Sequence, residues 1–384
     1  MIRRIILHIH RVIGLGAAFF LTLLGITGAI LVWEEELDAQ LNSALLYNRV
    51  NGPAMAPPEL IDAVTAEIGS ATIDFLSYPR DPQRSAIFYV SGLVSPLGPV
   101  NQVFVDRGDG RILGNRNTVT PNLYSRAELL PWLYQFHYSL VAGRTGIVLL
   151  GVVACLWFFD CLIAWYLTLP RRWTWHGWKP AWLINKNRLN FDVHRAVGLW
   201  LSPVLAVIAF TSIYFNLYTE VFLPVVNAVS TVTTQPYEGV PRPGPGNESR
   251  IEYAEALNTS YAELEGRGLQ VEALGYLSRN PQRGYYVAAF YTDRDLSRDA
   301  PSAHVYVNED GSLRHVRIIG EGSAGDAIVD WQFPLHSGQA FGLFGRIVVF
   351  LSGILLAVLS ATGVVIWWRK LRARKKWGQS KGPT

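Results

Sequence analysis

Four histidines stand beside long apolar runs of the chain, at positions where their side chains could act in pairs. His10 and His194 directly precede two of the runs, and His137 and His336 lie shortly before the other two. An ionisable side chain at membrane depth is costly and usually faces the interior of a helical bundle or a partner. For a single histidine, a helix–helix hydrogen bond or an interfacial cap would suffice. The repeated placement favours a shared role.

Two imidazoles at each of two depths restrict which metal or cofactor could bind there. Neutral imidazole binds iron, copper or zinc. Two imidazoles alone make a poor zinc site, because Zn²⁺ takes four ligands and no cysteine or carboxylate cluster accompanies these histidines. Two imidazoles do suffice for haem iron, because the porphyrin supplies four nitrogens. The sequence predicts two b-type haems with bis-histidine ligation, one held by His10 and His194 and one by His137 and His336.

Residues near the histidines fit this hypothesis. Gly14 and Gly198 follow His10 and His194 by four residues, so each lies one helical turn along on the same face. The missing side chains would leave room for a flat macrocycle. Arginines accompany all four histidines and suit bidentate pairing with a haem propionate. These arginines, which would serve equally as snorkelling or interfacial charges, are Arg11, Arg195, Arg144 and Arg346.

Other residues are interpreted as non-ligands. Asp160 lies inside the second apolar run, where it would hydrogen-bond a helix or accept a proton when the inner haem is reduced. The segment 320–325 matches G-x-G-x-x-G, but without a βαβ unit around it we expect a flexible loop. The remaining histidines lack matching histidines in the other half; they are His8, His176, His304 and His315. Cys155 and Cys161 are interpreted as buried small residues, because a thiolate metal site would need more cysteines.

The four apolar runs are the elements that must position the histidines. They cover about 12–33, 147–169, 196–218 and 347–368 in a chain of 384 residues that is 50% hydrophobic. Each run is long enough to cross a hydrocarbon core of about 30 Å as a helix. The first is too long for a cleaved signal peptide and lacks a clear cleavage site, so we predict an uncleaved span.

Basic residues indicate how the chain crosses the membrane. Lysines and arginines gather before the first run, between the second and third, and after the fourth. The positive-inside rule places both termini and the short link in the cytoplasm, and the two long segments outside, in a periplasm. The basic tail is expected to contact lipid, because no nucleic-acid motif accompanies it.

The chain also resembles a duplication of itself. "HRVIGLG" at His10 matches "HRAVGLW" at His194, and "RDPQR" at Arg80 matches "RNPQR" at Arg279. Trp132 and Trp331 each stand five residues before an outer histidine. Two halves of equal orientation imply a pseudo-two-fold axis along the membrane normal. The expected fold is therefore an integral membrane bundle of four helices with an internal duplication.

Each long outer segment is predicted to form a small α+β module. A helical pattern at 57–69 or 251–266 is followed by alternating strand patterns and turn signals such as "DRGDG" and "NEDG". The resulting boundaries are a first transmembrane helix at 1–33, a first module at 34–131, a second helix at 132–169, a cytoplasmic link at 170–195, a third helix at 196–218, a second module at 219–335, a fourth helix at 336–368 and a basic tail at 369–384.

These motifs resemble the PepSY-associated transmembrane family of bacterial inner-membrane proteins. The resemblance is carried by "HRVIGL", "HRAVGLW", "FHYSLVAGRTG", "PLHSGQAFGLFGR" and "VFVDRGDGRILG", and it covers nearly the whole chain. In particular the chain is similar to the FoxB-like, ferric-siderophore reductase branch. That likeness implies two PepSY-like modules, haem bound at the four membrane-edge histidines, and a role in iron acquisition by reduction of a ferric siderophore.

The expected function is thus an oxidoreductase that passes electrons across the bilayer. A quinol or flavoenzyme on the inner side would supply the electrons, and the ferric siderophore would receive them in the periplasm. Two alternatives stay open: a haem-free PepSY interaction or regulatory protein, and a transporter of the iron complex. The transporter is the weaker of the two, because only Asp160 is ionisable in the middle of a span.

Overall fold

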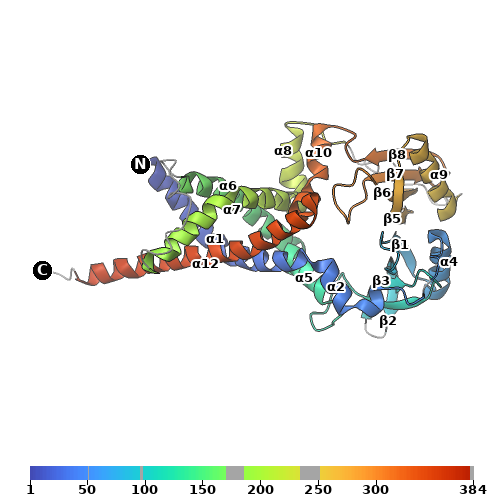
Figure 1. The fold of residues 1–384 in the computed structure, drawn as a ribbon, viewed down its shortest axis with the longest axis horizontal. Coiled ribbons are helices and arrows are strands. Elements are labelled where there is room, and N and C mark those ends of the chain that lie inside the picture. Colours follow the sequence, from blue (N-terminus) through green and yellow to red (C-terminus); the bar gives the residue numbers. More distant parts are fainter. Residues whose placement is uncertain (51, 96–97, 170–185, 234–250, 381–384) are drawn as a thin grey trace. The chain divides into compact units, whose positions relative to one another are not determined.

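A computed structural model describes residues 1–50, 52–95, 98–169, 186–233 and 251–380 (Figure 1). The chain divides into two compact units, each built from segments far apart in the sequence. The helical unit comprises Met1–Trp33, Leu133–Val225 and Gln332–Thr384. The sheet unit comprises Glu34–Trp132 and Val226–Trp331.

Four long apolar helices form the helical unit: α1 (Ile2–Leu31), α6 (Gly143–Thr168), α7 (Lys186–Asn216) and α12 (Gly342–Ser380). Each contains a stretch long and apolar enough to cross a membrane, which confirms the four predicted spans. Large apolar side chains such as Phe19, Phe159 and Phe344 point outward, with 68%, 59% and 72% of their surfaces exposed. Such surfaces are expected where a helix faces lipid.

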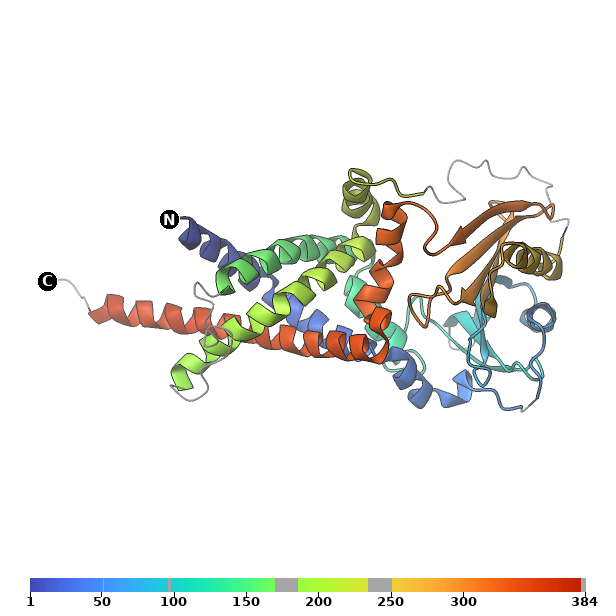
Figure 2. The same cartoon turned by 45° about the horizontal axis from the view of Figure 1, so that its top comes forward.

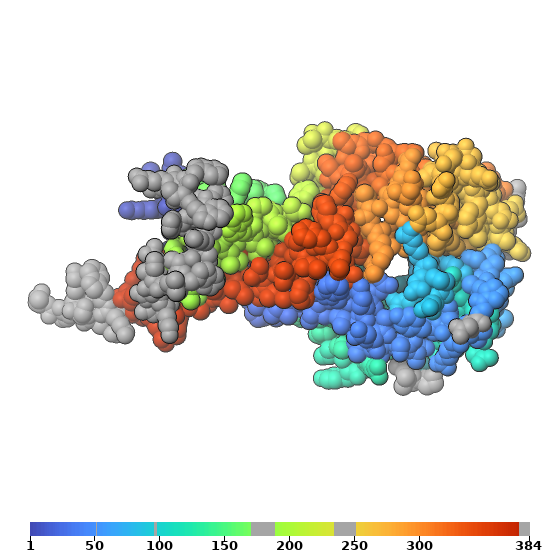
Figure 3. All heavy atoms as spheres, in the orientation of Figure 1, coloured from blue at the N-terminus to red at the C-terminus, as the bar shows by residue number. Residues whose placement is uncertain are grey.

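The helices pack as a four-cornered bundle. Helix α1 contacts α6 and α12, and α7 contacts the same two helices, so α1 and α7 occupy opposite corners (Figures 1 and 2). The space-filling view shows α12 lying against α7 on one face (Figure 3). Helices α1 and α12 approach closely at Gly25 and Gly353, where a Cβ on Gly25 would lie 2.5 Å from the Gly353 carbonyl oxygen. Small residues at such crossings let transmembrane helices pack backbone to backbone.

Two of the predicted spans are broken near their outer histidines. The segment 132–169 contains α5 (Leu129–Ser139) and then α6, and the segment 336–368 contains the end of α11 (Gln332–Ser337), a 3₁₀ turn (Gln339–Phe341) and part of α12. The second and fourth helices therefore differ from the single continuous helices that were predicted. The outer histidines lie on the short helices that precede the breaks.

Close backbone contacts explain the breaks. A Cβ on Gly146 would collide with the carbonyl oxygen of Ser139, and one on Gly345 would collide with that of Gly338. Each spanning helix thus starts against the end of the preceding short helix, which a continuous helix would not allow. Left-handed backbone angles make the turns, at Leu140, Val141 and Gly143 in the first break and at Gly338 and Gly342 in the second.

The start of the third helix also differs from prediction. Helix α7 begins at Lys186, inside the predicted link 170–195, and residues 170–185 lie outside the described ranges. Helix α12 continues to Ser380, so most of the predicted basic tail is helical. The Arg372 guanidinium lies 3.5 Å from the centre of the Trp368 ring, a cation–π contact at the end of the apolar stretch.

The sheet unit contains the elements predicted for the two outer segments. A short helix α2 (Glu34–Leu41) and a single turn α3 (Ser43–Leu46) lead into α4 (Pro57–Ile68). Four strands follow: β1 (Thr72–Ser77), β2 (Ala86–Ser95), β3 (Gly98–Val105) and β4 (Ile112–Arg116). The predicted helix at 57–69 and the strand patterns that follow it are confirmed.

The second outer segment repeats this order. After a π-helical turn (Tyr218–Phe222) and α8 (Leu223–Asn227), α9 (Tyr253–Gly266) precedes β5 (Val271–Asn280), β6 (Tyr285–Thr292), β7 (Ala303–Asn308) and β8 (Leu313–Ile318). Helix α10 (Ala324–Asp330) begins with a capping box in which the Ser323 hydroxyl accepts from the Asp326 backbone N–H. It occupies the end of the predicted glycine-rich loop at 320–325.

The two predicted modules share one antiparallel sheet. Its strand order is β4-β3-β2-β1-β5-β6-β7-β8, so two four-stranded meanders join at their first strands. Leu76 on β1 lies opposite Leu277 on β5, and both side chains are buried. Buried residues of α4 and α9, such as Val64 and Leu264, belong to the same hydrophobic core. The separate modules expected from the sequence are therefore halves of one folded body.

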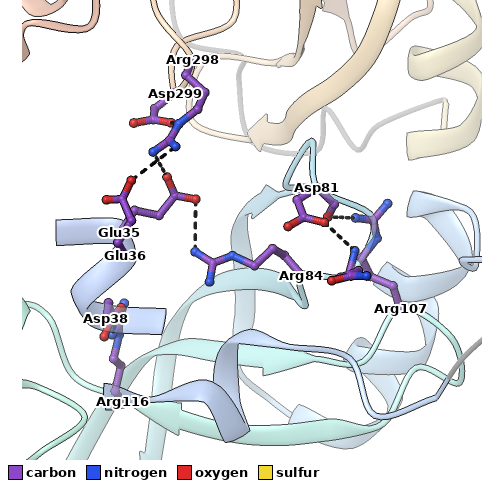
Figure 4. Close-up of polar contacts among 10 residues, drawn as sticks. Glu35, Glu36, Asp38, Asp81, Arg84, Arg107, Arg116, Arg298 and Asp299 are labelled. Carbon is purple, nitrogen blue, oxygen red and sulfur yellow. Dashed lines mark hydrogen bonds and ion pairs between the residues drawn. The ribbon is translucent and has the colours of Figure 1, made fainter. Parts of the chain in front are cut away.

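Ion pairs tie α2 to both halves of the sheet unit (Figure 4). Glu35 accepts from Arg84 at 3.2 Å and also pairs with Arg298, which lies on the β6–β7 connection. The Arg116 guanidinium on β4 donates to Asp38 at 2.7 Å and to Gln102 at 2.6 Å. Because Asp38 and Arg116 are buried, this pair fixes α2 against β4 through a fully satisfied polar contact.

Candidate functional site

His10 and His194 meet inside the helical unit from opposite corners of the bundle. Their ring centroids are 6.3 Å apart, and the ring planes are inclined by 49°. Two imidazoles that share one metal ion through bonds of ~2.0 Å would have centroids roughly 6 Å apart. The spacing of this inner pair therefore fits two axial ligands of a single metal.

Hydrogen bonds fix which nitrogen of each inner histidine carries the proton. His10 Nδ1 lies 2.9 Å from the Asp160 carboxylate of α6, and an ionised carboxylate can only accept. His194 Nδ1 lies 3.1 Å from the carbonyl oxygen of Leu359 and 3.0 Å from Thr362 Oγ1 on α12. A carbonyl also only accepts, so both neutral rings donate from Nδ1 and keep the lone pair on Nε2.

The outer histidines reach the same state with hydroxyl partners. His137 Nδ1 lies 2.8 Å from Thr27 Oγ1 on α1, and the Thr27 hydroxyl donates its one hydrogen to the Leu23 carbonyl at 2.9 Å. His336 Nδ1 lies 2.7 Å from Thr211 Oγ1 on α7. The Thr211 hydroxyl in turn donates to its own helix. Each hydroxyl oxygen must accept from the imidazole, so Nδ1 carries the proton here too.

All four rings therefore present Nε2 as the free ligating atom. Metal-binding histidines almost always donate their other ring N–H to a carboxylate, a carbonyl or a similar acceptor, which fixes tautomer and orientation. The two threonines were not predicted. A signal was present, because Thr27 follows His10 by 17 residues and Thr211 follows His194 by the same number.

The outer pair is enclosed by helix backbone and aromatic rings. A Cβ on Gly28 would lie 2.9 Å from His137 Cε1, so α1 passes directly against that ring. The Phe215 ring packs edge-on against His336 with centroids 5.2 Å apart. Both rings thus have one fixed position in the bundle.

Glycines other than Gly14 and Gly198 lie against the histidine rings. A Cβ on Gly363 would lie 3.2 Å from His194 Cε1, which matches the role of Gly28 at the outer end. At Gly14 and Gly198 an added Cβ would make only ordinary contacts at 3.9 Å, to Asp160 and to Leu359 respectively. Room exists beside these two glycines, and their contact with a macrocycle stays a prediction.

The four arginines differ in what they contact. Arg144 pairs with Glu220 at an exposed position. Arg346 donates to the Val32 carbonyl at 2.8 Å and lies 4.4 Å from the centre of the Trp33 ring. Arg195 lies 4.0 Å from Asp192 on its own helix, and Arg11 is half-buried. Arg144 and Arg346 already serve other contacts; propionate binding by the four stays a prediction.

Other candidate ligands are absent from the part of the chain that the structure describes. No group of three or more histidine, cysteine or acidic side chains there could hold a metal ion. His304 lies on β7 of the sheet unit, where burial and the nearby Arg317 lower its pKa to about 4. His8 is exposed, and His176 falls outside the described residues. A metal at either imidazole pair would therefore need further ligands besides the described histidine, cysteine and acidic side chains.

These features define an integral membrane protein with four apolar helices, paired internal imidazoles and a large antiparallel sheet. The family model of the PepSY-associated TM region matches residues 7–370, and the chain belongs to that family. Comparison with curated proteins gives no match. Membership confirms the resemblance found in the sequence at the level of the family.

Proposed function

We propose that this protein is a haem-containing reductase that carries electrons across the bacterial inner membrane to ferric siderophores in the periplasm. Two b-type haems would be held by His10 with His194 and by His137 with His336. Bound there, each haem supplies an iron that cycles between Fe(III) and Fe(II) by one electron. The observation that carries the proposal is that all four histidines donate from Nδ1 to fixed acceptors and present Nε2.

The bundle supports this role by holding the ligands rigidly. Asp160, Thr27, Thr211 and the α12 backbone orient the four rings before any ligand arrives. Such preorganisation of a ligand by a second partner tunes metal affinity and redox potential. Two sites at different depths would bring the electron from an inner donor, a quinol or flavoenzyme, to the outer side. Reduction to Fe(II) weakens the grip of hard oxygen ligands on the siderophore iron.

Internal duplication explains how two matched sites arose in one chain. The contacts of α1 with α6 and α12 are mirrored by those of α7 with α12 and α6. Gly146 and Gly345 occupy equivalent positions after the outer histidines and make equivalent backbone contacts. The sheet order is symmetric about the β1–β5 pair. We infer a pseudo-two-fold axis along the membrane normal, with both termini in the cytoplasm and the sheet unit in the periplasm.

Visible spectroscopy of the detergent-purified chain tests the proposal. We expect a Soret band that shifts on reduction and two haems per chain by pyridine haemochrome assay. His10→Ala and His336→Ala should each remove about one haem, whereas the exposed His8→Ala should retain both. A folded but colourless protein would reject the reductase and favour a haem-free interaction protein. Ferric-chelate reduction by vesicles of known orientation then tests the direction of transfer.

A further inference from the structure

The inner and outer histidine pairs differ in the charge of their hydrogen-bond partners. The inner pair has one carboxylate, Asp160, against His10 Nδ1 at 2.9 Å. The outer pair has two neutral hydroxyls, Thr27 and Thr211, at 2.8 Å and 2.7 Å. This difference breaks the correspondence between halves, since His194 uses a carbonyl and a hydroxyl where His10 uses a carboxylate.

Asp160 is buried within the bundle, with 8% of its surface exposed. Within the described residues its hydrogen-bond partner is His10, and no arginine or lysine side chain there is within salt-bridge distance of it. A buried carboxylate without a strong cation is costly, and its charge is weakly screened. A positive charge at the His10 ring or just beyond it would offset that cost.

A carboxylate acceptor changes the ligand as well as holding it. By accepting a strong hydrogen bond from His10 Nδ1–H, Asp160 raises the electron density on His10 Nε2. A more basic nitrogen and a nearby negative charge both favour Fe(III) over Fe(II), which lowers the reduction potential. A threonine hydroxyl is neutral, so it favours Fe(III) over Fe(II) less than a carboxylate does.

Nearby arginines do not cancel this difference. Arg195 lies beside Asp192, so its charge is partly balanced. Arg11 follows His10 by one residue, so its side chain leaves α1 about 100° around the helix from His10. The outer site has its own cations, Arg346 and the paired Arg144. Both ends thus carry arginines, and the buried carboxylate distinguishes the inner one.

On the basis of the proposed function, we propose that Asp160 holds the haem of the inner pair at a lower reduction potential than that of the outer pair. With haem held at both pairs, this order of potentials would make one-electron transfer from the inner to the outer site downhill, with no bond formed or broken. The electron would come from a quinol or flavoenzyme and would go to the ferric siderophore. Asp160 is a positioning residue in this scheme, since it acts through His10.

Spectroelectrochemical titration tests the inference without relying on turnover. The wild-type chain should show two separated midpoint potentials. His336→Ala, which retains the inner pair, should show the lower one, and His10→Ala should show the higher one. Asp160→Asn should raise the lower potential and leave the higher one in place. Asp160→Glu should keep the low value, and Glu67→Gln, at an exposed position of α4, should change neither potential.

The outcomes separate this inference from the proposed function. A wild-type chain without haem would reject the proposed function itself. Two haems with the inner potential equal to or above the outer one would overturn the inference alone. So would an Asp160→Asn variant that keeps both haems and an unchanged inner potential. If Asp160→Asn loses the inner haem, the two single-histidine variants still test the inference, because they give the order of the inner and outer potentials.

Discussion

A helix break follows both His137 and His336, but different residues form the two turns. Both place a spanning helix against the carbonyl end of a short helix, through Gly146 in one half and Gly345 in the other. The second break turns on Gly338 and Gly342, which adopt left-handed angles without a Cβ penalty. The first turns on Leu140 and Val141 at φ of 54° and 55°, where an L residue is strained.

The difference indicates that tertiary contacts impose the break. A β-branched residue such as Val141 adopts a positive φ only where its surroundings over-determine the backbone. The fixed ends are the His137–Thr27 hydrogen bond on one side and the Gly146 contact on the other. Strain in the first half is therefore a consequence of holding His137 against α1.

Filling the shared contact should have the largest effect. Gly146→Val or Gly345→Val would place a branched side chain where the carbonyl of the preceding helix lies. We expect each to destabilise by about 3 kcal/mol or more and to release the neighbouring histidine. Thermal unfolding in detergent measures the loss. Gly16→Ala is the control, since a Cβ there meets nothing within 4 Å; equal behaviour of all three would contradict the contact.

The first half also has an ionisable group that should impose a pH dependence. Burial raises the pKa of Glu34 to about 7, with Asp38 adding to the rise and Arg116 opposing it. The folded state then keeps a proton that the unfolded state has lost, so stability falls as pH rises from about 5 to 7.

Comparison of wild type with Glu34→Gln isolates this contribution. The wild-type free energy of unfolding of the sheet unit should fall by about 2–3 kcal/mol more than that of the variant over the same pH interval. Burial lowers the pKa of His304 to about 4, so its contribution makes the free energy of unfolding rise with pH. This contribution is the same in both proteins and cancels in their difference. Parallel pH profiles would show that Glu34 does not carry the proton.

A methyl group at Gly28 should displace the ring of His137, one of the two outer histidines. In Gly28→Ala the new Cβ would lie 2.9 Å from His137 Cε1, so the ring must shift away from Thr27. We expect a loss of about 1–2 kcal/mol and weaker binding at the outer pair, with the inner pair unaffected. Haem content and the outer midpoint potential measure this. An unchanged outer site would mean that the ring has room to move.

The smallest effects should have opposite signs in the two breaks. Val141→Gly removes strain at an exposed position and should stabilise by about 1 kcal/mol. Gly342→Ala introduces a Cβ at φ 57°, where nothing lies within 4 Å of it, and should destabilise by about 1 kcal/mol. Chemical or thermal unfolding in one detergent compares the two. Destabilisation by Val141→Gly would place the strain elsewhere.

Much of the architecture could be predicted because its signals are local. Apolar runs define the spans, and alternation with turn residues defines the strands, as at 86–92 and 303–308. The joining of β1 to β5 has no local signal, since it pairs strands from distant segments. The breaks were missed because "SLVAG" contains no residue that demands a turn before Gly143.

The residues of the candidate site were likewise predictable only in part. Matching positions in the two halves point to the four histidines, and the structure brings His10 and His194 together. The partners of the rings come from other helices, so only the structure identifies Thr362 and the contacts of Gly28 and Gly363. Asp160 stood out in the sequence as a charge within a span, but its link to His10 depends on how α1 packs against α6.

The pairing of β1 with β5 has a consequence for synthesis. Until β5 leaves the ribosome, about 200 residues after β1, the backbone groups on one side of β1 lack their native neighbour. At roughly 5–20 residues per second this delay is on the order of 10–40 s. A bare strand edge readily recruits foreign strands. The nascent first half therefore needs protection by a chaperone, or aggregation will compete with completion of the sheet.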